Sequence, residues 1–347
     1  MISRRHFIGT AAGLALMASP LAAFAADKLT VVTSFSILGD MVKQVGGDHV
    51  EVVMLVGPDG DTHAYEPSPA DARALADARL LIVNGLGLEG WLPRLVKTSG
   101  FKGVQVTASD GIELLKWDGA GRDDHHGDAH AEDDHAAHED RHASHDHAHD
   151  GKDHDDHAES AHHEEEGHHH GEYDPHAWQS LANGAIYVRS IAEALARIDP
   201  DHAADYESRA SAYAGHLNAL HAKLKADFAA IPAERRKVVT SHDAFRYFGH
   251  AYGVSFIAPE GLSTEAEASA GDVAKIIDQI REDRLEAVFL ENISDERLIR
   301  QIANETDARI GGQLYSDALS PAEGPAPDYV TMFEYNASQL LSALTGS

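Results

Sequence analysis

Short apolar runs alternate with segments of helical periodicity along most of the chain, and this alternation constrains the fold more than any other feature of the sequence. Such alternation is typical of a parallel sheet covered by helices. The predicted strands are residues 29–33, 50–56, 80–83 and 104–107, then 237–240, 255–258, 287–290 and 309–313. The predicted helices are residues 37–45, 68–78, 91–97 and 182–198, then 244–252, 270–283, 295–307 and 328–344.

The most regular helical pattern separates the two series. From Tyr206 to Phe228 apolar residues recur at steps of three or four. Asp199 stands where an N-cap is expected, Pro200 at the first helical position and Pro232 just past the end. A helix of about 30 residues spans roughly 45 Å, enough to run along two lobes. We therefore predict an α/β fold with two lobes, each a mostly parallel sheet flanked by helices, joined by one long rigid helix.

The N-terminal 25 residues have the pattern of an export signal. Arg4 and Arg5 precede an apolar stretch that ends at Ala23-Phe24-Ala25, a typical cleavage site. The two arginines fit an ordinary secretory signal and a twin-arginine signal equally well. The chain has no cysteine, so thiolate ligands, disulfides and a lipid-anchored cysteine are excluded. No later stretch is apolar for about 18 residues, and we expect a free periplasmic protein.

These boundaries predict the domain organisation. A mature chain of about 320 residues exceeds what one core usually serves. The predicted units are a signal at 1–25, an N-terminal lobe at 26–199, a linking helix at 200–231 and a C-terminal lobe at 232–347.

Residues 122–172 hold sixteen of the 25 histidines, together with 18 acidic and three basic residues. A solvated acidic linker would explain the charge but needs no imidazole. Alternating imidazoles and carboxylates offer many weak sites for zinc-like cations, so we predict a mobile metal-capturing loop at 120–172. Protons should compete with the metal below about pH 6 to 7. The remaining chain is acidic as well, which argues against nucleic-acid binding.

Four polar residues lie in predicted loops, three of them directly after predicted strands, where α/β sheets bind ligands. His63 and His242 come after strands, His176 follows the histidine-rich segment, and Asp317 follows the last strand. Three imidazoles and one carboxylate form a four-coordinate set that suits zinc and leaves no open position for a reactive water. Taken singly, each residue could instead be a helix cap, a turn residue or an exposed loop residue.

Five motifs resemble those of a known family. They are residues 61–67 (DTHAYEP), 174–178 (DPHAW), 241–248 (SHDAFRYF), 260–267 (EGLSTEAE) and 314–319 (LYSDAL). The chain is identified by them as a member of the cluster A-I family, and it most resembles the zinc-specific solute-binding proteins of bacterial ABC importers. The resemblance covers essentially the whole mature chain.

The resemblance implies a function and a ligand set. The family's histidine ligands fall on His63, His176 and His242, and its acidic ligand falls on Asp317. Manganese-binding relatives carry a glutamate where His242 stands, so the resemblance favours zinc, held as a transported ligand. It implies an ABC permease and its ATPase as partners and a monomeric state; a periplasmic zinc chaperone is a further candidate partner. Asp61 and Glu66 are close enough in sequence to orient the ring of His63.

A manganese-binding relative within the same family is one alternative to a zinc importer component, and three other functions remain as well. One is a zinc buffer or chaperone without a membrane partner, and another is a zinc hydrolase with Asp243 as base, although His-Glu-x-x-His is absent. The third is a dehydrogenase, because residues 85–90 (GLGLEG) match the dinucleotide pattern and Asp110 follows 20 residues on. Pro93 would then fall inside the helix that this pattern must open. We predict a non-enzyme that captures zinc between its lobes.

Overall fold

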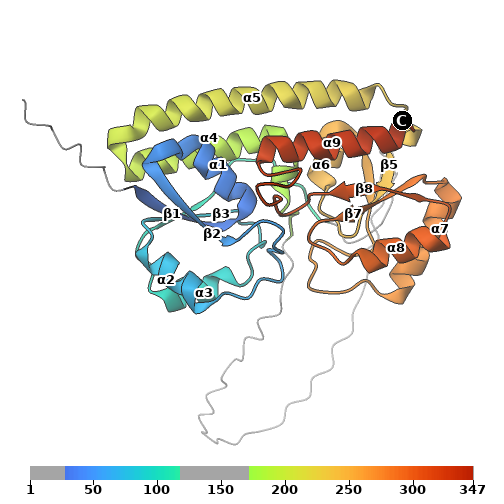
Figure 1. Cartoon of the computed structure of the whole chain (residues 1–347), viewed down its shortest axis with the longest axis horizontal. Coiled ribbons are helices and arrows are strands. Elements are labelled where there is room, and N and C mark those ends of the chain that lie inside the picture. The colour runs from blue at the N-terminus through green and yellow to red at the C-terminus, as the bar shows by residue number, and fades with distance from the viewer. Residues whose placement is uncertain (1–27, 118–171, 347) are drawn as a thin grey trace, which may run out of the picture.

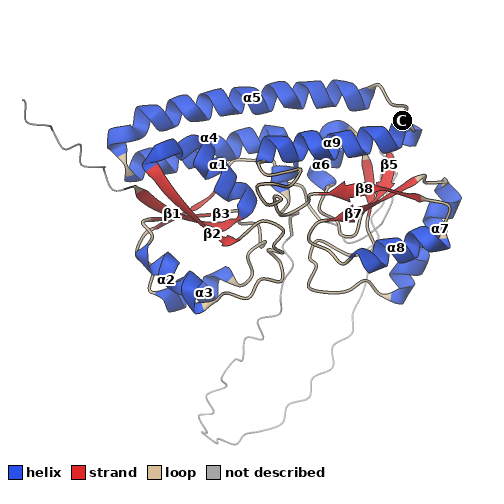
Figure 2. Ribbon diagram, viewed as in Figure 1, coloured by secondary structure: helices blue, strands red, loops and turns tan. Residues whose placement is uncertain are grey.

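The computed structural model describes residues 28–117 and 172–346, which form two α/β lobes with helices running along one side of both (Figures 1 and 2). Each lobe contains a four-stranded sheet whose neighbouring strands are all parallel. The strand orders are β2-β1-β3-β4 and β6-β5-β7-β8, so the two sheets have the same topology. The predicted fold class is confirmed. The proposed signal and nearly all of the histidine-rich segment lie outside the described residues.

The elements follow the predicted alternation closely. The first lobe consists of β1 (Leu29–Phe35), α1 (Ser36–Gly46), β2 (Val50–Val56), α2 (Pro69–Asp77), β3 (Leu80–Val83), α3 (Leu92–Ser99), β4 (Val104–Thr107) and α4 (Leu181–Ile198). After α5 (Ala203–Ala229), the second lobe consists of β5 (Lys237–Val239), α6 (Arg246–Tyr252), β6 (Ser255–Ile257), α7 (Ala270–Asp283), β7 (Ala287–Glu291), α8 (Glu296–Glu305), β8 (Arg309–Leu314) and α9 (Tyr329–Thr345).

The central strands β3 and β7 are buried along their whole length, which explains why they are nearly continuous apolar runs. Along β3, Leu80 and Ile82 join one hydrophobic cluster, whereas Leu81 and Val83 join another on the opposite face. Helices α1 and α4 contribute to the first cluster, and α2 and α3 to the second. The side chains of a strand alternate between faces, so a strand covered by helices on both sides has no polar face.

One hydrophobic cluster continues from the first lobe into the second. It contains side chains from one face of each sheet, the face covered by the helices that run along both lobes, and side chains from those helices, which are α1, α4, α5, α6 and α9. The opposite faces of the two sheets pack in separate clusters, against α2 and α3 in the first lobe and against α7 and α8 in the second. The lobes are thus joined by a shared core as well as by a helix. The lobe boundaries 26–199 and 232–347 stay predictions.

Helix α5 spans both lobes, with α4 beneath one half and α9 beneath the other (Figure 1). Its 27 residues correspond to a length of about 40 Å. The linking helix begins at Pro200, as predicted, with a 3-10 turn at residues 200–202 that leads directly into α5. Asp199 stands at the predicted N-cap position, but its side chain does not cap the helix. The Asp199 carboxylate accepts a hydrogen bond from the Tyr206 hydroxyl at 2.6 Å and contacts the His202 ring, and it makes no bond to the helix amides.

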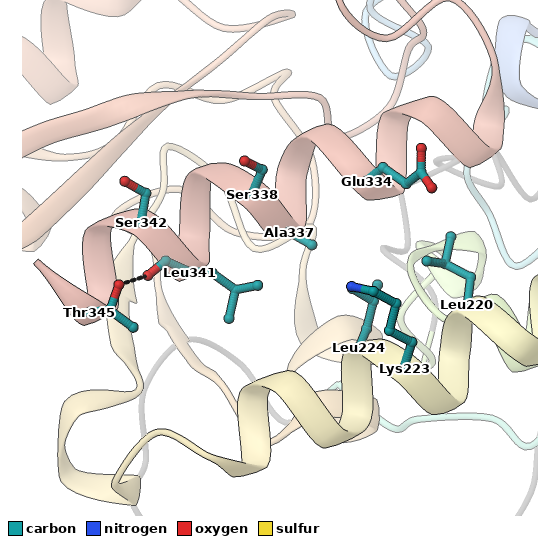
Figure 3. A pocket seen from close by; sticks show the side chains of 9 residues that line it. All are labelled: Leu220, Lys223, Leu224, Glu334, Ala337, Ser338, Leu341, Ser342 and Thr345. Carbon is teal, nitrogen blue, oxygen red and sulfur yellow. Dashed lines mark hydrogen bonds between the residues drawn. The ribbon is translucent and has the colours of Figure 1, made fainter. Parts of the chain in front are cut away.

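A shallow groove of about 450 Å³ lies between α5 and α9 (Figure 3). Leu220 and Leu224 line it from α5, and Ala337 and Leu341 line it from α9. None of the four predicted metal ligands lines this groove. The groove lies on the side of the molecule that carries α5 and α9, away from the predicted metal ligands.

Candidate metal site

The four predicted ligands meet in one place. Each of His63, His176, His242 and Asp317 offers one ligand atom, and these atoms all lie within 4.8 Å of one another. His63 is on the loop after β2, and His176 immediately precedes the short turn that leads into α4. His242 follows β5 and Asp317 follows β8. Each lobe therefore supplies two side chains, three of the four from loops that follow strands, and the cluster lies between the lobes.

The three imidazoles point their Nε2 atoms toward a single carboxylate oxygen. Asp317 Oδ2 lies 3.2 Å from His63 Nε2, 3.2 Å from His242 Nε2 and 3.7 Å from His176 Nε2. The Nε2 atoms of His63 and His176 are 3.2 Å apart. Four ligands at about 2.0–2.1 Å from a tetrahedral zinc ion lie roughly 3.3 Å from one another. Four of the six ligand-atom pairs, at 3.2 to 3.7 Å, therefore lie near the spacing of a tetrahedral site.

Solvent reaches the cluster at one residue. His176, His242 and Asp317 have no exposed surface, whereas His63 is 8% exposed. His63 also lines a cleft of about 1500 Å³ whose walls include Tyr65 and Trp91 from the first lobe and Leu262 from the second. An ion that enters or leaves by this cleft passes His63 first.

Two further carboxylates hold the ligand rings from behind. Asp174 Oδ1 accepts the backbone N–H of His176 at 2.9 Å and lies 2.8 Å from Nδ1 of its ring. Glu291 Oε1 accepts the backbone N–H groups of Ser241 and His242, and its Oε2 lies 2.7 Å from Nδ1 of His242. A carboxylate beside Nδ1 keeps the proton there and leaves the lone pair of Nε2 for a metal.

Sequence reasoning missed these two residues. It gave Asp174 no role, although the residue lies two positions before His176. Glu291 ends the buried strand β7, and a charged residue at the end of an apolar run was the signal that could have found it.

The predicted roles of Asp61 and Glu66 were wrong. Asp61 Oδ1 accepts the backbone N–H of His63 at 2.8 Å, so it fixes the chain and not the ring. Glu66 is exposed and lines the cleft.

The protonation states of the metal-free cluster are set by burial and by the carboxylates. Burial by itself lowers the pKa of His176, but Asp317 and Asp174 raise it to about 9. Burial also acts against the charge on His242, yet Glu291 and Asp317 hold its pKa well above the usual value. For His63 burial prevails and its pKa is lowered. Burial disfavours the charge on Asp317, but His176 and His242 hold its pKa well below the usual range. A metal ion that binds the cluster therefore competes with the protons on His176 and His242.

The glycine-rich turn at residues 85–90 is occupied by its own carboxylate. Glu89 is buried, and it accepts the amides of Asn84 and Gly85 at 2.7 and 3.1 Å and the Ser34 hydroxyl at 2.7 Å. A dinucleotide phosphate would need these turn amides. Pro93 lies in the first turn of α3, where proline is tolerated, so the objection based on a helix-interior proline was wrong. The pattern is structural because Glu89 fills the turn.

The comparisons with known proteins agree with this geometry. Residues 31–343 match the family described as zinc-uptake complex component A, periplasmic (ZnuA). The fold and the site define a metal-binding, substrate-binding protein of the ABC-transporter type. The chain belongs to the ZnuA family, and the cluster A-I prediction is confirmed at that level.

Individual relatives bind different metals. The chain is 31% identical to the manganese-binding lipoprotein MntA of Halalkalibacterium halodurans, over 92% of this chain and 89% of that protein. The Mn-bound periplasmic metal binding protein of Candidatus Liberibacter asiaticus has a TM-score of 0.70 at 28% identity, over 91% of this chain and all of that one. The periplasmic zinc binding protein TroA of Treponema pallidum has a TM-score of 0.72 at 27% identity, over 91% and 99%. In the described residues, no helix meets the length and apolarity needed to cross a membrane.

Proposed function

We propose that the protein is the periplasmic zinc-binding component of an ABC importer, which captures one zinc ion between its lobes and delivers it to a permease driven by an ATPase. The observation that carries this proposal is the convergence of three imidazole nitrogens and one carboxylate oxygen at tetrahedral spacing. The family match and the similarity to the manganese-binding lipoprotein MntA support a metal-transport role.

The donor set favours zinc over a harder cation. Imidazole nitrogen suits zinc, whereas manganese and magnesium favour carboxylate, carbonyl and water oxygens. All four donors are buried or nearly so, which leaves little room for additional water ligands. A filled shell also favours binding over catalysis, since a zinc hydrolase needs an open coordination position. We therefore propose that zinc is the transported ion and that the protein is not an enzyme.

Manganese is the second candidate cargo. The other oxygen of the Asp317 carboxylate, Oδ1, is buried and has no hydrogen-bond partner among the described residues. Both oxygens of Asp317 could therefore coordinate a larger ion and add a fifth donor. The name of the relative MntA agrees with that alternative.

A competition titration tests the choice of metal. The mature chain, stripped of metal, is titrated with zinc and with manganese in the presence of a chelator of known affinity for each. One zinc bound tightly and manganese bound at least about a hundredfold more weakly is the expected result, given the preference of nitrogen donors. Substituting His242→Glu should narrow that difference. Equal or tighter manganese binding by the unmodified chain would assign the site to manganese.

A variant without residues 122–172 tests the role of the histidine-rich segment. It should retain the one tight site, because the four ligands all lie outside the deleted segment. It should lose the additional weak binding that we propose for the segment. Loss of the tight site in a folded deletion variant would contradict this division of roles.

A further inference from the structure

The carboxylate of Asp61 joins the two lobes beside the proposed metal site. Its Oδ1 accepts the backbone N–H of His63 at 2.8 Å and that of Ala64 at 3.4 Å. Its Oδ2 accepts the hydroxyl of Thr264, a residue of the second lobe, at 2.5 Å. One side chain therefore holds the backbone of a ligand in one lobe and a loop of the other lobe at the same time.

Hydrogen bonds join the loop that carries Thr264 to the residues on both sides of His242. This loop follows β6, the counterpart in the second sheet of the strand that precedes His63. The amide of Glu260 donates to the carbonyl of Ser241 at 3.2 Å, and the amide of Asp243 donates to the carbonyl of Gly261 at 3.0 Å. A path of hydrogen bonds and of the loop backbone between Gly261 and Thr264 therefore links His63, through Asp61, to the residues flanking His242, without passing through the ion.

We propose that Asp61 and Thr264 are positioning residues that set the rate at which the bound metal leaves. His63 is the one ligand with solvent exposure, and it lines the cleft, so an ion departs by this side once His63 moves away. The Asp61–Thr264 hydrogen bond ties the backbone of His63 to the opposite lobe and opposes that movement. The proposal rests on the proposed function, because it assumes that the cleft binds a metal ion.

The threonine allows a nearly isosteric test. Thr264→Val removes the hydroxyl and keeps the branched shape, whereas Thr264→Ser keeps the hydroxyl and removes a methyl group. Ser263→Ala is the matched control, because it removes a hydroxyl from the same loop. The Ser263 hydroxyl accepts a hydrogen bond from the backbone N–H of Glu265, so its loss affects only contacts within the loop. The Thr264 hydroxyl bonds to Asp61 and is not one of the four metal-binding groups, so its substitution leaves those groups in place.

Zinc release from each loaded variant is followed in a stopped-flow instrument after addition of excess chelator. Loss of one hydrogen bond to a charged acceptor should raise the release rate about tenfold in Thr264→Val. Thr264→Ser and Ser263→Ala should release zinc within about twofold of the unmodified rate. Asp61→Ala should release zinc faster as well, because it removes the acceptor of the Thr264 hydroxyl and of the His63 amide, and adding Thr264→Val to Asp61→Ala should cause no further acceleration through this bond.

Hydrogen exchange separates failure of this proposal from failure of the proposed function. In metal-free protein, Thr264→Val should increase amide exchange in residues 61–66 and in residues 241–264 alike, and Ser263→Ala should not. That result supports the coupling even if the unmodified chain proves to bind no zinc tightly. Unchanged release together with unchanged exchange in Thr264→Val, or equal acceleration by Ser263→Ala, would overturn the proposal.

Discussion

At the scale of single residues, the binding chemistry depends on two carboxylates that lie behind the ligand rings. Glu291 and Asp174 each hold both the backbone and the ring Nδ1 of one ligand histidine. We predict that Glu291→Gln and Asp174→Asn each weaken zinc binding about 10- to 100-fold, as is typical when a partner of a ligand is lost. Chelator competition measures the change. Glu66→Gln is the control, since this exposed cleft residue should leave the affinity unaltered; an equal loss there would contradict the prediction.

Binding of a divalent metal ion should release protons from the ligand histidines. Near pH 7, His176 and His242 of the empty site are protonated because their carboxylate neighbours raise their pKa values, to about 9 for His176. The pKa of His63 is lowered, and so is that of Asp317, so neither holds a proton to release. One divalent ion therefore displaces roughly two protons, and affinity should increase as the pH rises toward 9.

Calorimetry in two buffers with different ionisation enthalpies measures this release. The apparent binding enthalpy should differ between the buffers by about twice the difference in their ionisation enthalpies at pH 7. An enthalpy that does not depend on the buffer would show that the imidazoles were already neutral.

The ligands themselves could be predicted from the sequence, whereas their supports could not. His63, His242 and Asp317 follow strands, and parallel sheets gather the residues after their strands at one edge. That rule requires only the strand positions. Glu291 acts on His242 because the two residues face each other across neighbouring strands. The alignment of two strands cannot be predicted from the periodicity of either one. Asp61 illustrates the same limit, because its partner Thr264 is about 200 residues away in the sequence.

At the scale of elements, two glycines in paired helices should respond oppositely to the same substitution. Gly215 lies in α5, is exposed, and has nothing within 4 Å of an added Cβ. Gly215→Ala should therefore stabilise the protein by about 0.5–1 kcal/mol. At Gly184 in α4, an added Cβ would lie 2.6 Å from the Tyr329 hydroxyl oxygen, so Gly184→Ala should destabilise by about 1–3 kcal/mol. Urea unfolding curves measure both, and a stabilising Gly184→Ala would contradict the packing.

The element boundaries show where local rules fail. The helix after Asp199 was predicted to begin at Pro200, because an aspartate followed by proline is a strong start signal. In the structure Asp199 instead binds the hydroxyl of Tyr206, and a 3-10 turn precedes α5. The linking helix still begins at Pro200, but its first turn is a 3-10 turn, and the bond to Tyr206 takes the place of side-chain capping by Asp199. The strands were predicted more accurately, because burial on both faces leaves a continuous apolar signature in the sequence.

At the scale of the whole molecule, the shared hydrophobic cluster opposes a wide separation of the lobes. It joins both sheets through α1, α4, α5, α6 and α9, and a large rotation would expose it to water. We therefore predict that metal binding orders the loops around His63 and His176 with little change in lobe orientation.

Spin labels can test this, because the chain contains no cysteine. Labels at Lys102→Cys in one lobe and Gln301→Cys in the other, both exposed positions, should give overlapping distance distributions with and without zinc. A resolved shift between the two distributions would show a hinge motion.

The split of the ligands between distant parts of the chain makes the ion an internal crosslink. His63 and Asp317 are separated by most of the mature sequence, and the protein has no disulfide to staple those parts together. Zinc at a thousandfold excess over its dissociation constant would stabilise the folded state by about 4 kcal/mol. Resistance to proteolysis should therefore follow metal supply, so that the empty protein is degraded sooner than the loaded one.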